Sequence, residues 1–195
     1  MHMCGRYYIG PEVGEKLQVQ PGEVFPGQMA PVILRGDAGE TVAMMKWGFP
    51  RIGGGGLVIN SRSEKADVTN MFRRAVRERR CLIPMTGFYE WRRSPSGSKS
   101  KEKFAFQRAD APEGLMYLAG MWGSFGKGED GFTGFVILTR EADEQMQPYH
   151  HRMPVILEGE SRRHWLYAPA DTPYSVFRQM FLPPRLRITA AGENP

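Results

Sequence analysis

The sequence predicts an α+β fold, a single compact domain with a curved, barrel-like sheet of mixed or antiparallel strands and a few short helices. Apolar and polar residues alternate in short segments through much of the chain, which is the pattern of half-buried strands. The 195 residues include 23 Gly and 15 Pro, and this content supplies the many turns that short strands require. Because no internal repeat and no long linker interrupts the sequence, we expect one domain.

Ten short segments carry the strand pattern. In chain order they are Pro31–Leu34, Thr41–Trp47, Leu57–Asn60, Cys81–Pro84, Phe88–Arg92, Phe104–Arg108, Met116–Phe125, Gly134–Thr139, Val155–Leu157 and Leu186–Ile188. Glycine, proline and polar residues stand between most of them, where the chain has to turn.

Helices are predicted to be fewer and short. The segment Asn70–Glu78 has the clearest pattern, because Met71, Phe72 and Ala75 lie on one side while arginines line the other. The other predicted helices are Val13–Val19, Ala142–Met146, Ser161–Leu166 and Pro173–Phe181.

The remaining segments are predicted to be loops and ends. Gly53–Gly56 is a flexible loop, and it is not a phosphate-binding loop because no Gly-Lys-Ser/Thr follows it. Ser94–Lys103 is polar and basic, as expected for a hairpin tip or loop. We expect the domain to span residues 3–189, with residues 1–2 a leader left by recombinant cloning and residues 190–195 a frayed C-terminal tail.

The composition limits the classes of function. With 41% hydrophobic and 24% charged residues, the chain can build a core. Its net charge of +5 is compatible with a polyanionic partner. Two cysteines and no signal-like apolar segment favour a reducing, cytoplasmic location. No run approaches the ~18 apolar residues of a membrane span, so we expect no membrane association.

The tripeptide Cys4-Gly5-Arg6 is the most informative motif. If Met3 is the natural initiator and is removed, Cys4 carries a thiol and a free α-amine on one residue. Such a pair attacks an aldehyde through nitrogen to give a Schiff base, and sulfur then closes a five-membered thiazolidine. The α-amine has a pKa of ~8 and the thiol one of ~8.5, so both are reactive near neutral pH. The alternative is an incidental cysteine in a disordered terminus.

Glu90 is an acidic residue inside the apolar strand segment Gly87–Trp91. Alternation places Glu90 on the same face as Phe88, while Tyr89 and Trp91 lie on the other. If that face is core, desolvation raises the pKa of the carboxyl and makes it a proton shuttle near neutral pH. The alternative is a glutamate that points to solvent.

Two adjacent histidines, His150 and His151, are candidates for acid–base chemistry at physiological pH. A closed zinc site needs about four ligands, and only Cys4 and Cys81 could supply sulfur. We therefore expect no metal and no other cofactor. Asn60, at the end of a predicted strand, reads by itself as a turn or cap residue.

Five arginines surround the predicted helix at residues 70–78; they are Arg73, Arg74, Arg77, Arg79 and Arg80. Phosphate contacts explain them as well as a solvated helix face does. Aromatic residues are interleaved with the basic ones; they are Trp47, Phe49, Phe72, Tyr89 and Trp91. These rings suit stacking on unpaired bases and suit a core equally well.

Taken together, five segments in order resemble the SRAP family, the SOS response-associated peptidase-like proteins. The segments are Cys4-Gly5-Arg6, Trp47-Gly48, Asn60-Ser61-Arg62-Ser63-Glu64, Gly87-Phe88-Tyr89-Glu90-Trp91 and His150-His151-Arg152-Met153-Pro154. The resemblance implies a sensor and shield for abasic sites in single-stranded DNA. It also implies a covalent thiazolidine crosslink between the N-terminal cysteine and the ring-opened deoxyribose.

The resemblance assigns roles to four catalytic residues. Cys4 is the expected nucleophile, and Asn60 orients the sugar or the cysteine amine. Glu90 moves protons during ring opening and imine formation. His150 assists ring opening and protonates the sugar oxygen.

DNA contacts are expected from basic residues and one aromatic residue. Arg6 and Arg62 would hold the flanking phosphates, as guanidinium groups do through paired hydrogen bonds. The remaining predicted contacts are Trp47, Arg73, Arg74 and Arg77. The expected partner is single-stranded DNA with abasic sites, bound by a monomer in a bacterial cytoplasm.

Two other functions remain open at this stage. One is a thiol peptidase, active on its own leader, which would need a thiolate but no free amine. The other is a non-catalytic single-stranded DNA-binding protein, which would tolerate Cys4→Ala and show salt-sensitive affinity alone. The abasic-site reading treats the protein as a crosslinking enzyme of the lyase or peptidase-like SRAP class.

Overall fold

The computed structural model describes residues 5–93 and 101–191. Its strands are β1 (Tyr7–Ile9), β2 (Gly22–Val24), β3 (Met29–Gly36), β4 (Gly39–Trp47), β5 (Phe49–Pro50), β6 (Leu57–Val58), β7 (Asn60–Arg62), β8 (Arg80–Met85), β9 (Gly87–Arg93), β10 (Lys101–Arg108), β11 (Met116–Phe125), β12 (Phe132–Glu141), β13 (Arg152–Pro154), β14 (Ile156–Leu157) and β15 (Leu186–Ala190). Its helices are α1 (Pro11–Leu17), α2 (Ala75–Glu78), α3 (Gly159–Tyr167) and α4 (Tyr174–Gln179), with 3₁₀ turns at Ser63–Lys65 and Gly128–Asp130.

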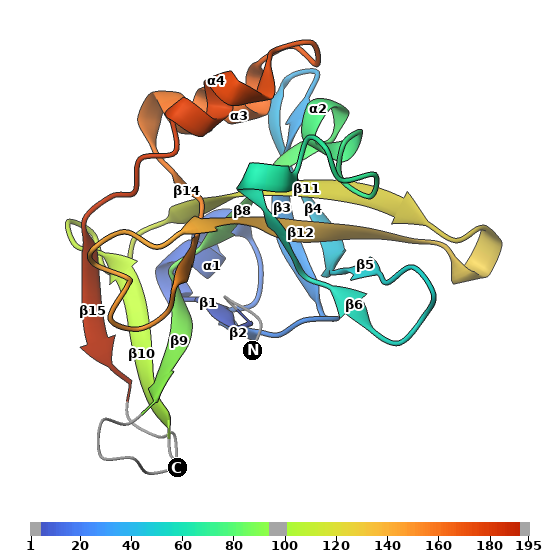
Figure 1. Cartoon of the computed structure of the whole chain (residues 1–195). Helices are drawn as coiled ribbons and strands as arrows, with labels where there is room; N and C mark the ends of the chain where they lie inside the picture. Colours follow the sequence, from blue (N-terminus) through green and yellow to red (C-terminus); the bar gives the residue numbers. More distant parts are fainter. Residues whose placement is uncertain (1–4, 94–100, 192–195) are drawn as a thin grey trace.

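Five strands close into a barrel in the order β12, β4, β3, β8, β11 and back to β12 (Figure 1). The pair β12–β4 is parallel, and the other four pairs are antiparallel. The sheet is therefore mixed and closed, as the predicted barrel-like α+β fold requires. Beyond the barrel, the C-terminal half of β12 pairs with β7 and with β13.

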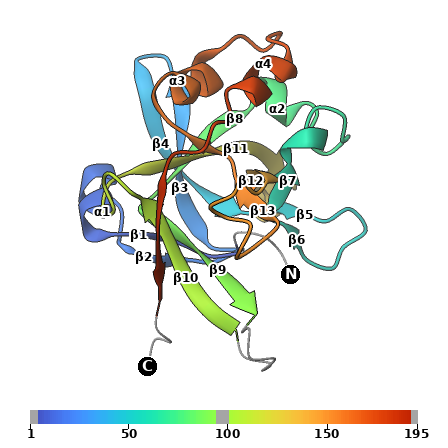
Figure 2. The same cartoon turned by 60° about the vertical axis from the view of Figure 1, so that its left-hand side comes forward.

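A second sheet of five strands lies beside the barrel in the order β15, β10, β9, β1, β2 (Figure 2). All of its pairs are antiparallel. Its register places Tyr7 opposite Phe88 and places Phe104 opposite Glu90. This sheet and β7 and β13 carry the candidate site.

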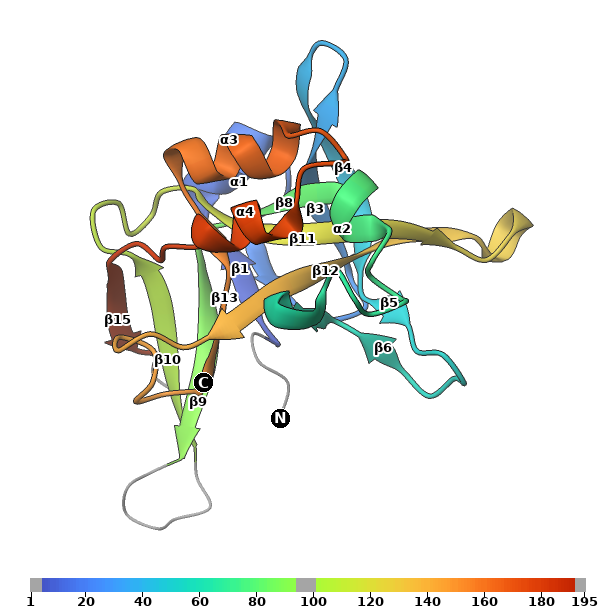
Figure 3. The ribbon, with the colours of Figure 1, turned by 45° about the horizontal axis from the view of Figure 1, so that its top comes forward.

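The helices α2, α3 and α4 cover the other side of the barrel (Figures 1 and 3). Helix α3 is fastened to β8, because the Trp165 indole N–H donates to the Cys81 carbonyl at 3.0 Å. Among the described residues, no helix is both long and apolar enough to cross a membrane.

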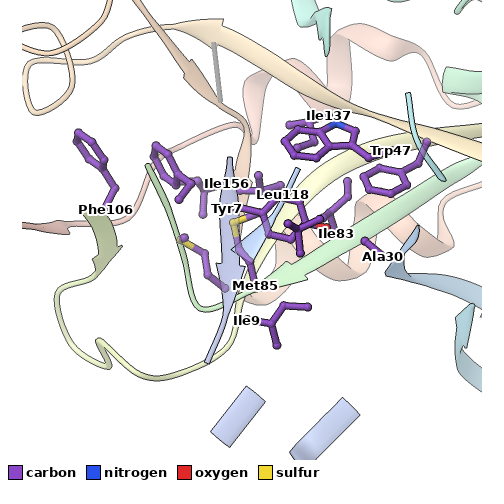
Figure 4. Close-up of a cluster of buried hydrophobic side chains, with 14 of the residues drawn as sticks. Tyr7, Ile9, Ala30, Trp47, Ile83, Met85, Phe106, Leu118, Ile137 and Ile156 are labelled. Carbon is purple, nitrogen blue, oxygen red and sulfur yellow. The ribbon is translucent and has the colours of Figure 1, made fainter. Parts of the chain in front are cut away.

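Alternation along the barrel strands divides the core in two. On β8, Ile83 faces the cluster shared with the second sheet, whereas Leu82 faces the cluster beneath the helices. Figure 4 shows the first cluster, in which Tyr7 lies among Met85, Leu118 and Ile156. The strands thus bind both layers into one folding unit.

Two predicted helices were wrong in length or type. The segment expected at Asn70–Glu78 is helical only over Ala75–Glu78. Phe72, 7% exposed, packs against Phe49 with ring centroids 6.0 Å apart, and this tertiary contact overrides the local helical pattern.

The segment expected to be a helix at Ala142–Met146 forms turns. The Asp143 carboxylate accepts the Met146 N–H at 3.1 Å, which is a turn-forming bond. Pro148 then blocks continuation, because it has no N–H to give. At the C-terminus, β15 includes Ala190, the first residue of the expected tail. Of the expected hairpin tip, residues 94–100 lie outside the described residues.

Candidate active site

Glu90 is the buried carboxylate of the site. It lies on β9 with 1% of its surface exposed, on the same inward face as fully buried Phe88. Its cross-strand neighbour is Phe104 on β10. The prediction that Glu90 shares the core face with Phe88 is confirmed, and the solvent-facing alternative is wrong.

The loop before β13, which carries His150, runs beside the second sheet (Figures 2 and 3). Tyr149 packs edge-on against Phe104 at 4.6 Å and against Phe106 at 5.3 Å. Because Phe104 lies directly opposite Glu90, Tyr149 anchors the loop beside the carboxylate. His150 follows Tyr149 directly in this anchored loop.

His150 Nδ1 lies against the main chain of Arg152. The Arg152 N–H is 3.0 Å from Nδ1 and the Arg152 carbonyl is 3.3 Å from it, so Nδ1 accepts from the N–H when bare and donates to the carbonyl when protonated. Burial, and then the nearby charge of His151, lower the pKa of His150 below its ordinary 6.5. The two rings stack with centroids 4.4 Å apart. His150 therefore has main-chain partners in both protonation states.

A buried ion pair joins the histidine loop to the segment that carries Asn60. Arg152, 9% exposed, makes two hydrogen bonds of 2.9 Å to the Glu64 carboxylate and one of 2.8 Å to the Thr139 carbonyl. Desolvation is the largest single effect and opposes ionisation of Glu64, but the hydrogen bonds and charge of Arg152 together with main-chain hydrogen bonds outweigh it and lower the pKa of Glu64. This clamp, the Arg152–Glu64 pair, holds β13 against the turn after β7.

Asn60 and Arg62 lie on β7, which runs parallel to β12. The strand is fixed at its start because the Trp47 indole N–H donates to the Ile59 carbonyl at 3.1 Å. Asn60 is half-buried, and Arg62 is exposed. Arg62, His151 and Arg152 together line a cavity of about 410 Å³.

Arg6 lies immediately before β1, on the face opposite Tyr7. Its guanidinium lies 4.5 Å from the centre of the Phe25 ring and 5.0 Å from that of Trp91. It also pairs with Glu23 at 3.3 Å, and its side chain remains 31% exposed. Arg6 is therefore held in place, with part of its surface open to a ligand.

The start of β1 lies between the strands that carry the other site residues. Tyr7 pairs with Phe88, two positions before Glu90. The Tyr7 ring lies 5.1 Å from that of Trp47, whose indole holds the residue before Asn60. Cys4 lies outside the described residues, three positions before Tyr7 in the sequence.

Cys81 can be excluded as a nucleophile. It is fully buried on β8, and burial raises the pKa of its thiol strongly. The chain contains two cysteines. Any thiol chemistry of this protein therefore depends on Cys4.

Some predicted DNA contacts lie elsewhere. The expectation for Trp47 is wrong, since its ring is 0% exposed and packs inside the core, out of reach of a base. Arg73, Arg74 and Arg77 lie at α2, across the barrel from β1 and β9 (Figure 1). Arg74 is paired with Glu78 at 2.7 Å. The structure does not bring these three arginines to the candidate site.

The family model of the SOS response associated peptidases, SRAP, matches residues 3–189. This chain belongs to the SRAP family. Abasic site processing protein YoaM of Bacillus subtilis is 29% identical over 93% of this chain and 86% of the relative. Abasic site processing protein YedK of Escherichia coli is 32% identical over 56% of this chain and 47% of the relative. A crystal structure of a protein from Bordetella bronchiseptica, 26% identical, superposes with a TM-score of 0.80 over 97% of this chain and all of that one.

Two functional features of this SRAP chain escaped the residue-level reading. Glu64 and Arg152 stand inside the motif segments, but no role was predicted for either. Their separation of 88 positions hides the ion pair from any local pattern. The signal that could have found them is their position, four residues after Asn60 and two after His150. Within residues 5–93 and 101–191, no group of three His, Cys, Asp or Glu is placed to hold a metal.

Proposed function

We propose that this SRAP protein senses abasic sites in single-stranded DNA and forms a covalent thiazolidine crosslink with them through Cys4, which shields the lesion. The observation that carries the proposal is the inward-facing, 1% exposed carboxylate of Glu90 on β9, the strand that pairs with β1. The names of the relatives, abasic site processing proteins, support the same DNA lesion as substrate. We further propose a monomer acting in the cytoplasm.

The reaction balances without a cofactor. The closed hemiacetal loses its hydroxyl proton to a base, gains a proton on the ring oxygen and opens to the 1′-aldehyde. The α-amine of Cys4 adds to the carbonyl carbon, and loss of one water gives an imine. The thiolate sulfur then adds to the same carbon, and the nitrogen takes up a proton as the thiazolidine closes. Aldehyde, amine and thiol thus yield thiazolidine and one water.

Two side chains supply the proton transfers. His150 in its imidazolium form gives the Nε2 proton to the ring oxygen and keeps Nδ1–H, for which the Arg152 carbonyl at 3.3 Å is an acceptor. The Glu90 carboxylate accepts the hydroxyl proton and later returns a proton to the departing water. Its burial keeps bulk water away from the imine.

The other residues bind and orient the strand. Asn60 orients the sugar or the Cys4 amine from β7. Arg6 and Arg62 hold the phosphates on either side of the lesion, each from a partly or fully exposed position. Phosphate contacts carry no sequence information, so capture is expected at abasic sites in any sequence.

The test is a denaturing gel after incubation with an abasic single-stranded oligonucleotide. Three forms are compared: protein that begins at Cys4, the same protein with Cys4→Ala, and protein that keeps Met1–Met3. A shifted band for free Cys4 alone is the expected result. If no form gives a band although mass spectrometry confirms the exposed Cys4, crosslinking is refuted.

The same three forms address the peptidase reading, which the description of the family favours. A thiol peptidase needs the thiolate and not the amine. Amide hydrolysis that survives in the form that keeps Met1–Met3, where the Cys4 nitrogen is acylated, while crosslinking is lost, would identify a separate peptidase activity.

A further inference from the structure

A second cationic cavity lies on the helical side of the molecule. It has a volume of about 310 Å³ and opens between the end of β3, the α2–β8 junction and the C-terminus of α3. Figure 1 shows α2 and α3 across the barrel from β1 and β9, so this cavity is separate from the candidate active site. Its polar and aromatic lining includes Arg35, Arg77, Arg80 and Trp122.

Arg80 is a fixed positive charge at the base of the cavity. Its guanidinium donates to the carbonyls of Trp165 at 2.6 Å, Arg77 at 2.7 Å and Val76 at 3.3 Å, and also to that of Ala168. Within the described part of the chain, no carboxylate pairs with it. Burial, and then the charge of Arg35, lower its pKa to about 10, so it stays charged at pH 7.

Arg35 and Arg77 provide further guanidinium donors in the lining. Both are exposed, and neither pairs with a carboxylate of residues 5–93 or 101–191. Arg35 uses one N–H on the Tyr167 carbonyl at 3.2 Å. Glu78, an acid of the lining, is already paired with Arg74. The lining therefore holds three guanidinium groups and one carboxylate that is already paired. This excess of positive charge attracts an anion.

An aromatic wall completes the cavity. Trp122 is partly buried on β11, and its main-chain N–H donates to the Arg79 carbonyl at 2.9 Å. The Arg79 guanidinium lies 5.4 Å from the centre of the ring and holds the indole in place. An indole beside arginines offers a base-stacking surface next to phosphate donors. The volume lies at the lower end of the range for small-molecule sites.

We propose that this cavity binds a nucleotide, with its phosphate held by Arg35 and Arg77 over Arg80 and its base against Trp122. The nucleotide is either free or part of a nucleic-acid strand; the chemistry of recognition is the same. The site does not take part in crosslinking, and its occupancy does not require Cys4.

The test measures binding by titration calorimetry with three probes: inorganic phosphate, a deoxynucleoside monophosphate and an undamaged single-stranded oligonucleotide. The protein is compared with the double variant Arg35→Gln/Arg77→Gln. The matched control is Arg51→Gln/Arg187→Gln, which removes the same charge from exposed positions outside the cavity. Thermal unfolding of each variant verifies that it folds.

We expect the Arg35/Arg77 variant to bind the monophosphate about tenfold more weakly, as loss of charge-assisted hydrogen bonds implies, and the control to bind as the parent does. The same loss with the oligonucleotide identifies a strand as the source, whereas loss with the monophosphate alone identifies a free nucleotide. Trp122→Leu should weaken binding of the monophosphate and leave the affinity for inorganic phosphate unchanged. Equal affinities in the two double variants, or no binding of any probe, would overturn the proposal. Crosslinking of an abasic oligonucleotide by the same variants is scored separately, so failure of either proposal is visible.

Discussion

At the scale of single residues, the protonation of His150 makes the proposed crosslinking reaction depend on pH. Its pKa lies below 6.5 because of burial and the charge of His151. In the neutral ring Nδ1 accepts the Arg152 N–H, and in the imidazolium Nδ1–H has the Arg152 carbonyl as its acceptor. The proposed acid is the imidazolium, so its working form is present below this lowered pKa and is lost as the pH rises through it.

We predict that His151→Ala moves the alkaline limb of the crosslinking rate to higher pH. Removing the neighbouring charge lets the pKa of His150 rise toward 6.5, so the imidazolium acid persists to higher pH. The measurement is the single-turnover crosslinking rate between pH 4.5 and 7.5, values chosen around the ordinary pKa of about 6.5. His164→Gln, on the distant helix α3, is the control and should leave the limb in place. An unmoved limb in His151→Ala would show that another group controls it.

Glu90 gives the second prediction at this scale. Glu90→Gln keeps the shape of the side chain but removes the proton acceptor, and we expect the crosslinking rate to fall about 100-fold, the lower end for general acid–base catalysis. Glu102→Gln on the neighbouring strand, which removes the ion pair with Arg92, serves as the control. Rates within about twofold of each other in the two variants would remove Glu90 from the mechanism.

The buried or exposed position of a residue was easiest to predict on strands that alternate apolar and polar side chains. The inward position of Glu90 follows from its place beside Phe88 on an alternating strand. Trp47 was harder, because an aromatic ring suits a base and a core equally. The burial of its ring depends on contacts with Tyr7 and Phe135, which come from strands far away in the sequence.

At the scale of elements, the Arg152–Glu64 pair fastens β13 to the turn after β7. We predict that Glu64→Gln lowers the free energy of unfolding by about 1–2 kcal/mol, near the lower end for hydrogen bonds to charged groups because Glu64 is partly exposed. Urea unfolding at pH 7 measures it. The control Glu78→Gln, which removes an exposed pair with Arg74, should leave the free energy nearly unchanged.

The same pair has a defined pH dependence. Because the folded-state pKa of Glu64 is lowered from 4.5, its contribution to stability is complete above 4.5 and is lost as the pH falls through the folded value. Glu64→Gln should therefore flatten the stability profile on the acid side of pH 4.5. An identical slope in both proteins would contradict the clamp.

Short elements limited the prediction of the fold. Strands β1, β2 and β13 have three residues each, and three residues cannot establish a period. Yet β1 pairs with β9, the strand that carries Glu90, and β13 carries Arg152. Both are specified by pairing with partners far along the chain, so local pattern could not find them.

At the scale of the whole molecule, the sequence predicts a barrel-like sheet but not which strands pair to close it. The antiparallel pair β11–β12 connects neighbouring segments and follows from the sequence pattern. The closing parallel contact of β12 with β4 joins Gly134 to Lys46, and only the three-dimensional packing determines it. That closure separates basic regions, with Arg6 at the start of β1 in the second sheet, Arg62 in the cavity with His151 and Arg152, and Arg73, Arg74 and Arg77 at α2 on the side of the helices (Figure 1).

This separation predicts that DNA length decides which arginines matter. An abasic oligonucleotide of about eight nucleotides, within the range that small single-strand sites cover, should reach Arg62 but not α2. Arg62→Gln should then weaken non-covalent binding in the Cys4→Ala protein and reduce the slope of log affinity against log salt by about 0.7, the value for one phosphate on a single strand. Arg73→Gln/Arg74→Gln should leave that slope unchanged with the short strand and reduce it with a strand several times longer that can pass around the barrel. A slope loss from the α2 variant with the short strand would mean that the lesion binds on the helical side, and the candidate site would have to be moved there.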